Sequence, residues 1–167
     1  MPKLIKLHGR SADWANEAFT HVVDDQPVPE AGGVILSLSR FQTEGDALLE
    51  EGRSVGVRLE SAEAVEDLVY DLPRLSLVAL NFPKFRDGRA YTSARLLRER
   101  FGFDGEIRAV GEVLREQAGF MVRCGFDAFE PSDGSDPQAW VATAFRFRHV
   151  YQRAADDRQP AFVERGS

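Results

Sequence analysis

Five short apolar runs, each separated from the next by a segment that suits a helix, dominate the middle of this chain. They lie at Val34–Leu38, Val55–Leu59, Leu75–Phe82, Glu106–Val110 and Phe126–Phe129. Runs of about four to eight mostly apolar residues, alternating with amphipathic or capped segments, are typical of βα units. Such units build parallel sheets with right-handed crossovers. The pattern therefore predicts an α/β fold with a mostly parallel sheet.

The segments between and after these runs have the signals of helices. We expect helices over Phe41–Glu51, Ser61–Tyr70, Arg89–Phe101 and Glu112–Arg123, and a last one that begins at Pro137 and carries Ala139, Trp140, Ala144 and Phe147. Ser61 and Asp136 are residue types that cap helix N-termini, and proline suits the first helical position. The chain thus predicts five strands alternating with five helices.

The spacing of the strands limits the architecture. We expect a single domain over residues 1–153, with a short N-terminal strand or hairpin at Leu4–Trp14 and a connector that ends near Gly33. A complete eight-stranded barrel needs roughly 250 residues, more than this chain has. An open doubly wound sheet or a partial-barrel-like sheet fits better, and residues 154–167 are expected to form a flexible tail.

The charge of the chain argues against some partners. Its net charge of −6 does not favour nucleic-acid binding. The segment from Lys84 to Arg123 nevertheless holds nine basic and six acidic residues, whereas the rest of the chain holds 12 and 21. This central segment could face an anionic partner, or its arginines could simply lie on solvated helix faces.

Cysteine and histidine usage limits the cofactors. The single cysteine, Cys124, excludes an internal disulfide and a Cys-ligated iron–sulfur cluster, and we expect it to be a structural thiol. His8, His21 and His149 lack the spacing of zinc ligands, so no metal site is expected. Neither a flavin nor a nicotinamide motif is present. Without a signal peptide or an apolar run long enough for a membrane span, we expect a cytoplasmic protein.

The loop after the most apolar strand run is the main candidate site. Lys84, Arg86, Asp87, Gly88 and Arg89 lie where that strand gives way to a helix, and ligands of parallel α/β proteins bind at this edge of the sheet. The three cations and the free N–H groups of the helix start could hold a phosphate, sulfate or carboxylate. Alternatively, Asp87 is only the N-cap, and Arg89 and its neighbours pair with Asp87, Glu112 or Glu130.

Other polar residues follow the remaining strands at the same edge. They are Arg40, Arg58, Asn81, Gly111, Glu112 and Glu130. Gly111 and Glu112 could form a second corner with Glu112 as an acid or base, or Glu112 could be a first-turn residue that favours the helix dipole. No catalytic triad or paired-carboxylate motif is present, so whether the protein is an enzyme stays open.

Long stretches of the chain resemble the bacterial family DUF934. The stretches are Phe82–Tyr91, Ala94–Phe103, Gly105–Gln117 and Arg123–Glu130, together with Pro29–Gly33 and Val55–Leu59. Members of this family are usually described as oxidoreductases involved in sulfite reduction and sulfate assimilation. The family pattern commonly has Asn at the position of Glu112, which weakens an essential acid role for that residue.

The resemblance implies a function in sulfur assimilation. One hypothesis is an accessory protein or oxidoreductase component of assimilatory sulfite reduction, with sulfite reductase as its partner. The other hypothesis is a small α/β enzyme or binding protein for an anionic metabolite at the corner Lys84–Arg89. A flavin spectrum of the purified protein would favour the redox role.

Overall fold

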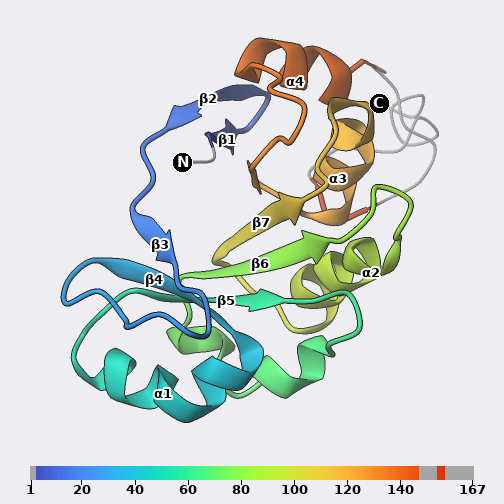
Figure 1. The fold of residues 1–167 in the computed structure, drawn as a ribbon. Helices are drawn as coiled ribbons and strands as arrows, with labels where there is room; N and C mark the ends of the chain where they lie inside the picture. The colour runs from blue at the N-terminus through green and yellow to red at the C-terminus, as the bar shows by residue number, and fades with distance from the viewer. Residues whose placement is uncertain (1–2, 147–153, 157–167) are drawn as a thin grey trace.

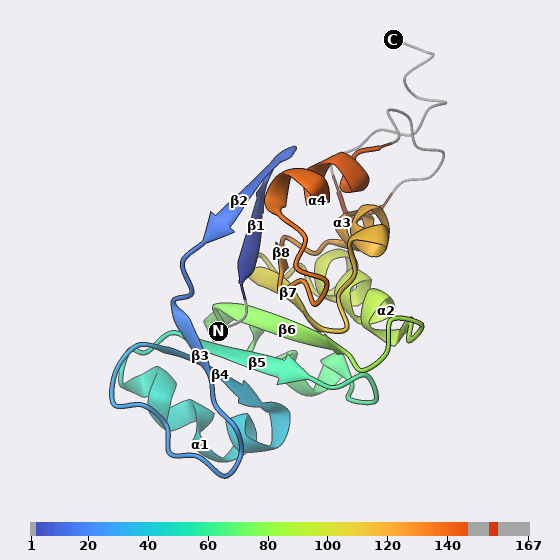
Figure 2. The same cartoon turned by 45° about the horizontal axis from the view of Figure 1, so that its top comes forward.

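One eight-stranded sheet forms the centre of the computed structural model, which describes residues 3–146 and 154–156. Its strands lie in the order β2 (Ser11–Ala15), β1 (Leu4–His8), β8 (Ala128–Phe129), β7 (Glu106–Gly111), β6 (Leu77–Phe82), β5 (Val55–Leu59), β4 (Gly33–Ser37) and β3 (Phe19–His21). Strands β3 to β8 run parallel, each beside its neighbour in sequence, whereas β1 pairs antiparallel with both β8 and β2. Figure 2 shows this succession of strands.

The sequential strand order decides the architecture. Right-handed crossovers between consecutive neighbours all pass on the same side of a sheet. Helices α1 (Leu38–Glu50), α2 (Arg89–Arg95) and α3 (Ala118–Cys124) therefore cover one face, and the sheet curls into a half-barrel (Figure 1). The partial-barrel alternative is confirmed. The doubly wound alternative is wrong, because it needs helices on both faces.

The main hydrophobic core lies between the sheet and these helices. Alternate residues of the parallel strands, such as Val57, Val78 and Ala109, point into it together with Phe41 of α1 and Leu97. A second, smaller cluster lies on the opposite, concave face of the sheet and comprises Ile35, Leu77, Ala79 and Val110, with Phe19 packed against it. The strands are thus buried on both faces, which explains their near-continuous apolar character.

Two of the predicted helices differ from those in the structure. Helix α1 begins at Leu38, because the Ser37 side chain accepts a hydrogen bond from Arg40 N (3.3 Å) and caps it. The helix predicted over Ser61–Tyr70 is wrong: the chain forms two 3₁₀ turns, Val65–Leu68 and Leu72–Arg74. Side chains three apart eclipse in a 3₁₀ turn, which lets Val65 and Leu68 enter the core together.

Four further differences concern α2, α3, β8 and β3. Helix α2 passes into a π-helical turn at Leu96–Arg100, within the predicted helix Arg89–Phe101. The helix predicted from Glu112 starts later, because Leu114 is extended and a 3₁₀ turn at Arg115–Gln117 leads into α3. Strand β8 is only two residues long, and β3, which contains Phe19, is not predicted from the sequence.

The ends of the chain agree with expectation as far as they are described. The hairpin of β1 and β2 is confirmed, and α4 (Pro137–Ala144) begins behind Asp136, whose side chain accepts from Ala139 N (2.8 Å). Phe147 and residues 157–167 of the expected tail lie outside the described residues. Within residues 3–146 and 154–156, no helix has the length and apolar character that crossing a bilayer requires.

Candidate functional site

The corner between β6 and α2 is an exposed loop at the carboxyl edge of the sheet. Lys84, Arg86 and Arg89 are all exposed there, and a shallow hollow is lined by Pro83, Lys84 and residues 86–89. Two contacts hold the loop from the side of the next βα unit: Glu112 Oε2 accepts from Phe85 N (2.9 Å), and Gln117 Nε2 donates to Phe85 O (2.5 Å). The sequence prediction of a charged loop at this edge is therefore confirmed in its placement.

One of the three cations at the corner is already paired. Arg89 donates from Nε and Nη2 to Asp87 (3.1 and 2.7 Å), and Arg89 N donates to Asp87 Oδ1 (3.1 Å). These hydrogen bonds hold the pKa of the Asp87 carboxyl well below its usual range. Of the alternatives weighed from the sequence, the pairing of Arg89 with Asp87 is present, whereas the expected N-cap is wrong: Gly88, and not Asp87, is the N-cap of α2.

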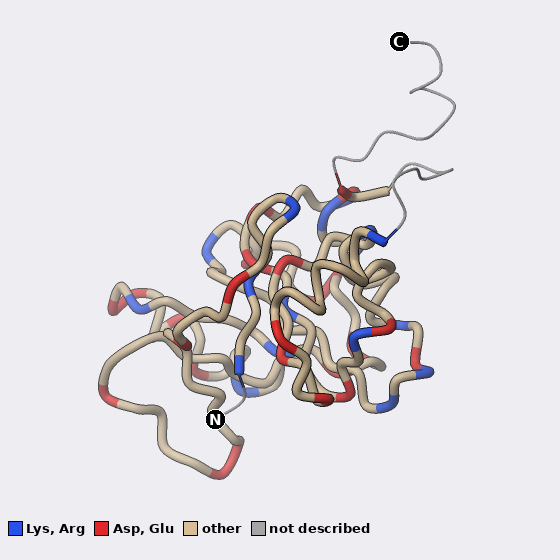
Figure 3. The backbone as a smooth tube through the Cα atoms, turned by 90° about the horizontal axis from the view of Figure 1, so that it is seen from above, with Lys and Arg blue, Asp and Glu red and all other residues tan. Residues whose placement is uncertain are grey.

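The other two cations lack such a partner. Among the described residues, neither Lys84 nor Arg86 forms an ion pair, and the Arg86 guanidinium lies 5.3 Å from the centre of the Phe85 ring. Glu112 accepts from the backbone N–H of Phe85 and forms no ion pair with either cation within the described residues. Basic and acidic residues are otherwise interspersed along the backbone (Figure 3). Lys84 and Arg86 are therefore the cations of this loop that are available to an anion.

The remaining candidates at the carboxyl edge form a separate polar group. Asn81 Nδ2 donates to Glu60 Oε2 (2.5 Å), and Arg58 Nε donates to Glu60 Oε1 (2.9 Å). Gly111 lies directly against Asn81, since a Cβ added to Gly111 would come within 2.4 Å of Asn81 Oδ1. Arg40 instead turns toward Glu44 of its own helix (3.0 Å). No acid or base role for Glu112 is supported by these contacts.

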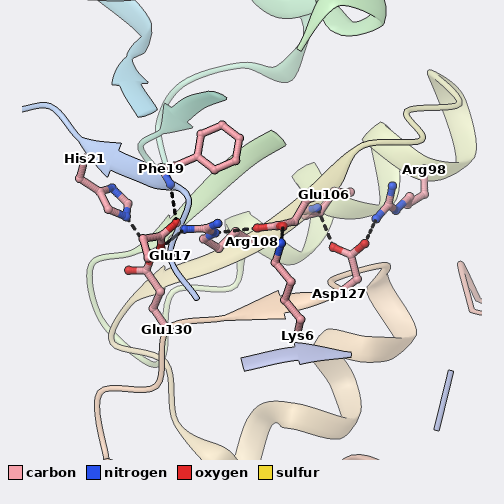
Figure 4. A network of polar contacts seen from close by, with 10 residues as sticks. Lys6, Glu17, Phe19, His21, Arg98, Glu106, Arg108, Asp127 and Glu130 are labelled. Carbon is pink, nitrogen blue, oxygen red and sulfur yellow. Dashed lines mark hydrogen bonds and ion pairs between the residues drawn. The ribbon is translucent and has the colours of Figure 1, made fainter. Parts of the chain in front are cut away.

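A second group of charged residues lies on the concave face of the half-barrel, and Figure 4 shows it from close by. Its centre is Arg108 of β7, whose side chain has 0% exposure. Arg108 Nη1 donates to Glu17 Oε2 (2.6 Å) and Glu130 Oε1 (3.1 Å), and its Nε donates to Glu106 Oε1 (2.7 Å).

The outer members of this group come from distant elements. His21 at the end of β3 lies 2.8 Å from Glu130 Oε1, and Lys6 of β1 lies 2.9 Å from Glu106 Oε2. The oxygen and nitrogen ligand atoms of Glu17, His21 and Glu130 all lie within 4.8 Å of one another. We refer to Lys6, Glu17, His21, Glu106, Arg108 and Glu130 as the concave-face cluster.

The basic and acidic side chains of the concave-face cluster stabilise each other's charged forms. Burial opposes the charge of Arg108, but the attraction of Glu106 and Glu17 outweighs it and raises the pKa of the guanidinium. Burial likewise opposes ionisation of Glu130, but the hydrogen bond from His21 and the attraction of Arg108 lower the pKa of its carboxyl. Glu130 and Arg108 are therefore charged at neutral pH.

Sequence reasoning found only part of this cluster. Glu130 was expected at the carboxyl edge, but Glu17, His21, Glu106 and Arg108 were not recognised as a group. The available signal was Arg108 itself, since a charged residue within the apolar run Ile107–Val110 has to be paired if the strand is buried on both faces.

A comparison with protein families matches the whole of the corner but only part of the concave-face cluster. The model of the family described as "Bacterial protein of unknown function (DUF934)" matches residues 56–162. The chain belongs to the DUF934 family. The DUF934 span contains the corner Lys84–Arg89 together with Arg108 and Glu130, whereas Glu17 and His21 lie before it. A search of curated proteins found no match to the chain.

Proposed function

We propose that this protein serves assimilatory sulfite reduction in the cytoplasm, as an accessory protein or oxidoreductase component that acts beside sulfite reductase. Its membership of the DUF934 family supports the proposal, through the role usually described for members of that family. Having one cysteine favours an accessory role, because a Cys-ligated iron–sulfur cluster needs several thiolates. Electrons would then come from the partner or from an organic cofactor.

The observation that carries the proposal is the pair of exposed cations at the corner. Lys84 and Arg86 have no ion-pair partner within the described part of the chain, although the protein as a whole is acidic. Sulfite and sulfate are small oxyanions, and ammonium and guanidinium groups bind such anions through charge-assisted hydrogen bonds. Lys84 and Arg86, two positions apart in sequence, also repel each other, and a bound anion relieves that repulsion.

Growth of a deletion strain tests the pathway. We expect a strain that lacks the protein to grow poorly on sulfate or sulfite as sole sulfur source and normally on sulfide or cysteine. The wild-type gene should restore growth, and the Lys84/Arg86/Arg89 triple-Ala variant should restore it less well. Equal growth of the deletion and parent strains on all four sulfur sources would contradict the proposal.

Calorimetry with the purified protein tests the corner. We expect saturable binding of sulfite that the triple-Ala variant weakens and that added salt screens. An Arg74→Ala variant is the matched control, because Arg74 is also exposed but pairs with Asp46 (2.7 Å) away from the corner. Binding of sulfite that is equal in wild-type protein and in a folded triple-Ala variant would show that the corner is only a helix start.

The same cations favour a second candidate function, a small α/β enzyme or binding protein for another anionic metabolite. The two functions differ in ligand preference. Two results together would favour the metabolite function over a role in sulfite reduction. The purified protein would bind phosphate or a carboxylate more tightly than sulfite or sulfate, and the deletion strain would grow normally on sulfate.

A further inference from the structure

We propose that Glu17, His21 and Glu130 bind one divalent transition-metal ion on the concave face of the half-barrel. This inference is independent of the proposed function, because it involves neither the corner nor sulfite. Two carboxylates and an imidazole are donors that suit ions such as Zn²⁺ and Mn²⁺. Their ligand atoms already lie within 4.8 Å of one another.

The position of these residues in the fold favours a ligand site. His21 ends β3, and Glu130 directly follows β8, so both lie at the carboxyl edge of the parallel strands, where α/β proteins bind their ligands. The 2.8 Å between His21 Nε2 and Glu130 Oε1 is slightly shorter than the separation of two adjacent ligands on one ion, which for bonds of about 2.1 Å is about 3.0 Å at a right angle and about 3.4 Å at the tetrahedral angle.

The charge of the cluster also favours a cation. Glu17, Glu106 and Glu130 supply three carboxylates, whereas Lys6 and Arg108 supply two positive charges. The three carboxylates outnumber these two cations, and the contact of His21 with Glu130 lies in a region where Arg108 is completely buried and Glu130 is 9% exposed. An uncompensated charge is costly in such surroundings, and a divalent cation would compensate it.

A second, independent observation points to a ligand beside the metal. Arg108 Nη2 is buried and has no hydrogen-bond partner among the described residues, although Nη1 and Nε of the same guanidinium donate to Glu17, Glu106 and Glu130. A buried donor without an acceptor is destabilising. Three protein ligands leave coordination positions open, and an oxygen ligand in one of them would supply the acceptor that Arg108 Nη2 lacks.

The contacts of the cluster leave room for metal coordination. Each carboxylate oxygen has two lone pairs, so Glu17 and Glu130 can each accept from Arg108 and still bind an ion. His21 would bind through Nε2, which then carries no proton. Arg108 would act as a positioning residue that orients the two carboxylates, as partners of metal ligands commonly do.

Calorimetry on the full-length protein, freed of metal with a chelator, provides the test. We expect Zn²⁺ or Mn²⁺ to bind at one ion per chain and to bind at least about tenfold more weakly to His21→Ala, Glu17→Gln and Glu130→Gln variants. His8→Ala and Glu66→Gln are matched controls, since both residues are exposed and lie outside the cluster, and they should leave the affinity unchanged.

An NMR measurement on the unmodified protein keeps the test decisive where a variant fails to fold. Zn²⁺ should shift the imidazole ¹⁵N resonance of His21 and leave that of His8 unchanged. An unshifted His21 resonance, or equal affinity of wild type and a folded Glu17→Gln variant, would overturn the proposal. The concave-face cluster would then be a closed network of ion pairs.

Discussion

His21 Nε2 lies 2.8 Å from Glu130 Oε1, although 109 residues separate the two in sequence and four strands separate β3 from β8 in the sheet. This contact is made across the concave face, which shows how strongly the sheet curls. Arg108 completes the connection, because its Nη1 reaches both Glu130 and Glu17, the residue that precedes β3 by two positions. Polar contacts thus connect β3 with β7 and with the end of β8 across the half-barrel, where a full barrel would have further strands.

Arg108→Met should destabilise the protein strongly. The variant keeps much of the side-chain volume but leaves Glu17, Glu106 and Glu130 without their central cation. Breaking a buried ion pair from one side costs about 3–5 kcal/mol. Urea unfolding measures the change, and Arg58→Met is the control, because the exposed Arg58–Glu60 pair should contribute only about 0–1 kcal/mol. Similar losses in both variants would contradict the central role of Arg108.

Gly111→Ala should destabilise the protein more than Gly134→Ala. Both glycines have positive φ (91° and 71°), so both substitutions strain the backbone by about 1 kcal/mol. Only at Gly111 does the added Cβ also meet Asn81 Oδ1 and the Phe82 carbonyl oxygen, each at 2.4 Å. We expect an additional loss of about 1–3 kcal/mol there, measured by thermal or urea unfolding. Equal losses would mean that β6 and β7 can separate at no cost.

Alkaline pH should destabilise the wild-type protein more than a Cys124→Ser variant. Burial raises the pKa of the Cys124 thiol to about 11 from an ordinary value of 9.0. Because the unfolded chain loses this proton first, the stability linked to the thiol is fully present below about pH 9 and is lost as pH rises toward 11. Serine does not titrate in this range.

Urea unfolding at pH 8 and pH 10.5 checks the Cys124 prediction. The free energy of unfolding should fall further between pH 8 and pH 10.5 in wild type than in Cys124→Ser, and growth on sulfate should be the same for both if the thiol is structural. A native thiol that reacts with iodoacetamide as fast as free cysteine at pH 8 would contradict the prediction, since Cys124 is only 1% exposed.

Asp87→Asn should strengthen anion binding at the corner. The substitution removes the carboxylate that pairs with Arg89 and frees this guanidinium beside Lys84 and Arg86. Calorimetry with sulfite should therefore give a lower Kd for Asp87→Asn than for wild type, and the gain should disappear in an Asp87→Asn/Arg89→Ala double variant. Unchanged or weaker binding by a folded Asp87→Asn protein would exclude Arg89 from the anion site.

The sequence by itself determined the elements whose signals are local. The apolar runs gave β4 to β7 nearly residue by residue, and Asp136 with Pro137 marked the start of α4, because strand patterns and caps depend on residues only a few positions apart. The corner at Lys84–Arg89 was predictable for the same reason, since the end of a buried strand fixes where its loop emerges. The pairing of Arg89 with Asp87, two positions away, was one of the alternatives that the sequence offered for this corner.

Only the tertiary structure decided the strand order, the curl and the concave-face cluster. Parallel βα units have the same local sequence pattern whether their helices cover one face of the sheet or both, so the half-barrel could not be separated from a doubly wound sheet. Arg108 meets Glu17 across 91 residues and Glu130 across 22, and no sequence period links them. Their meeting depends on the summed twist and curl of the intervening strands, which is a property of the assembled sheet.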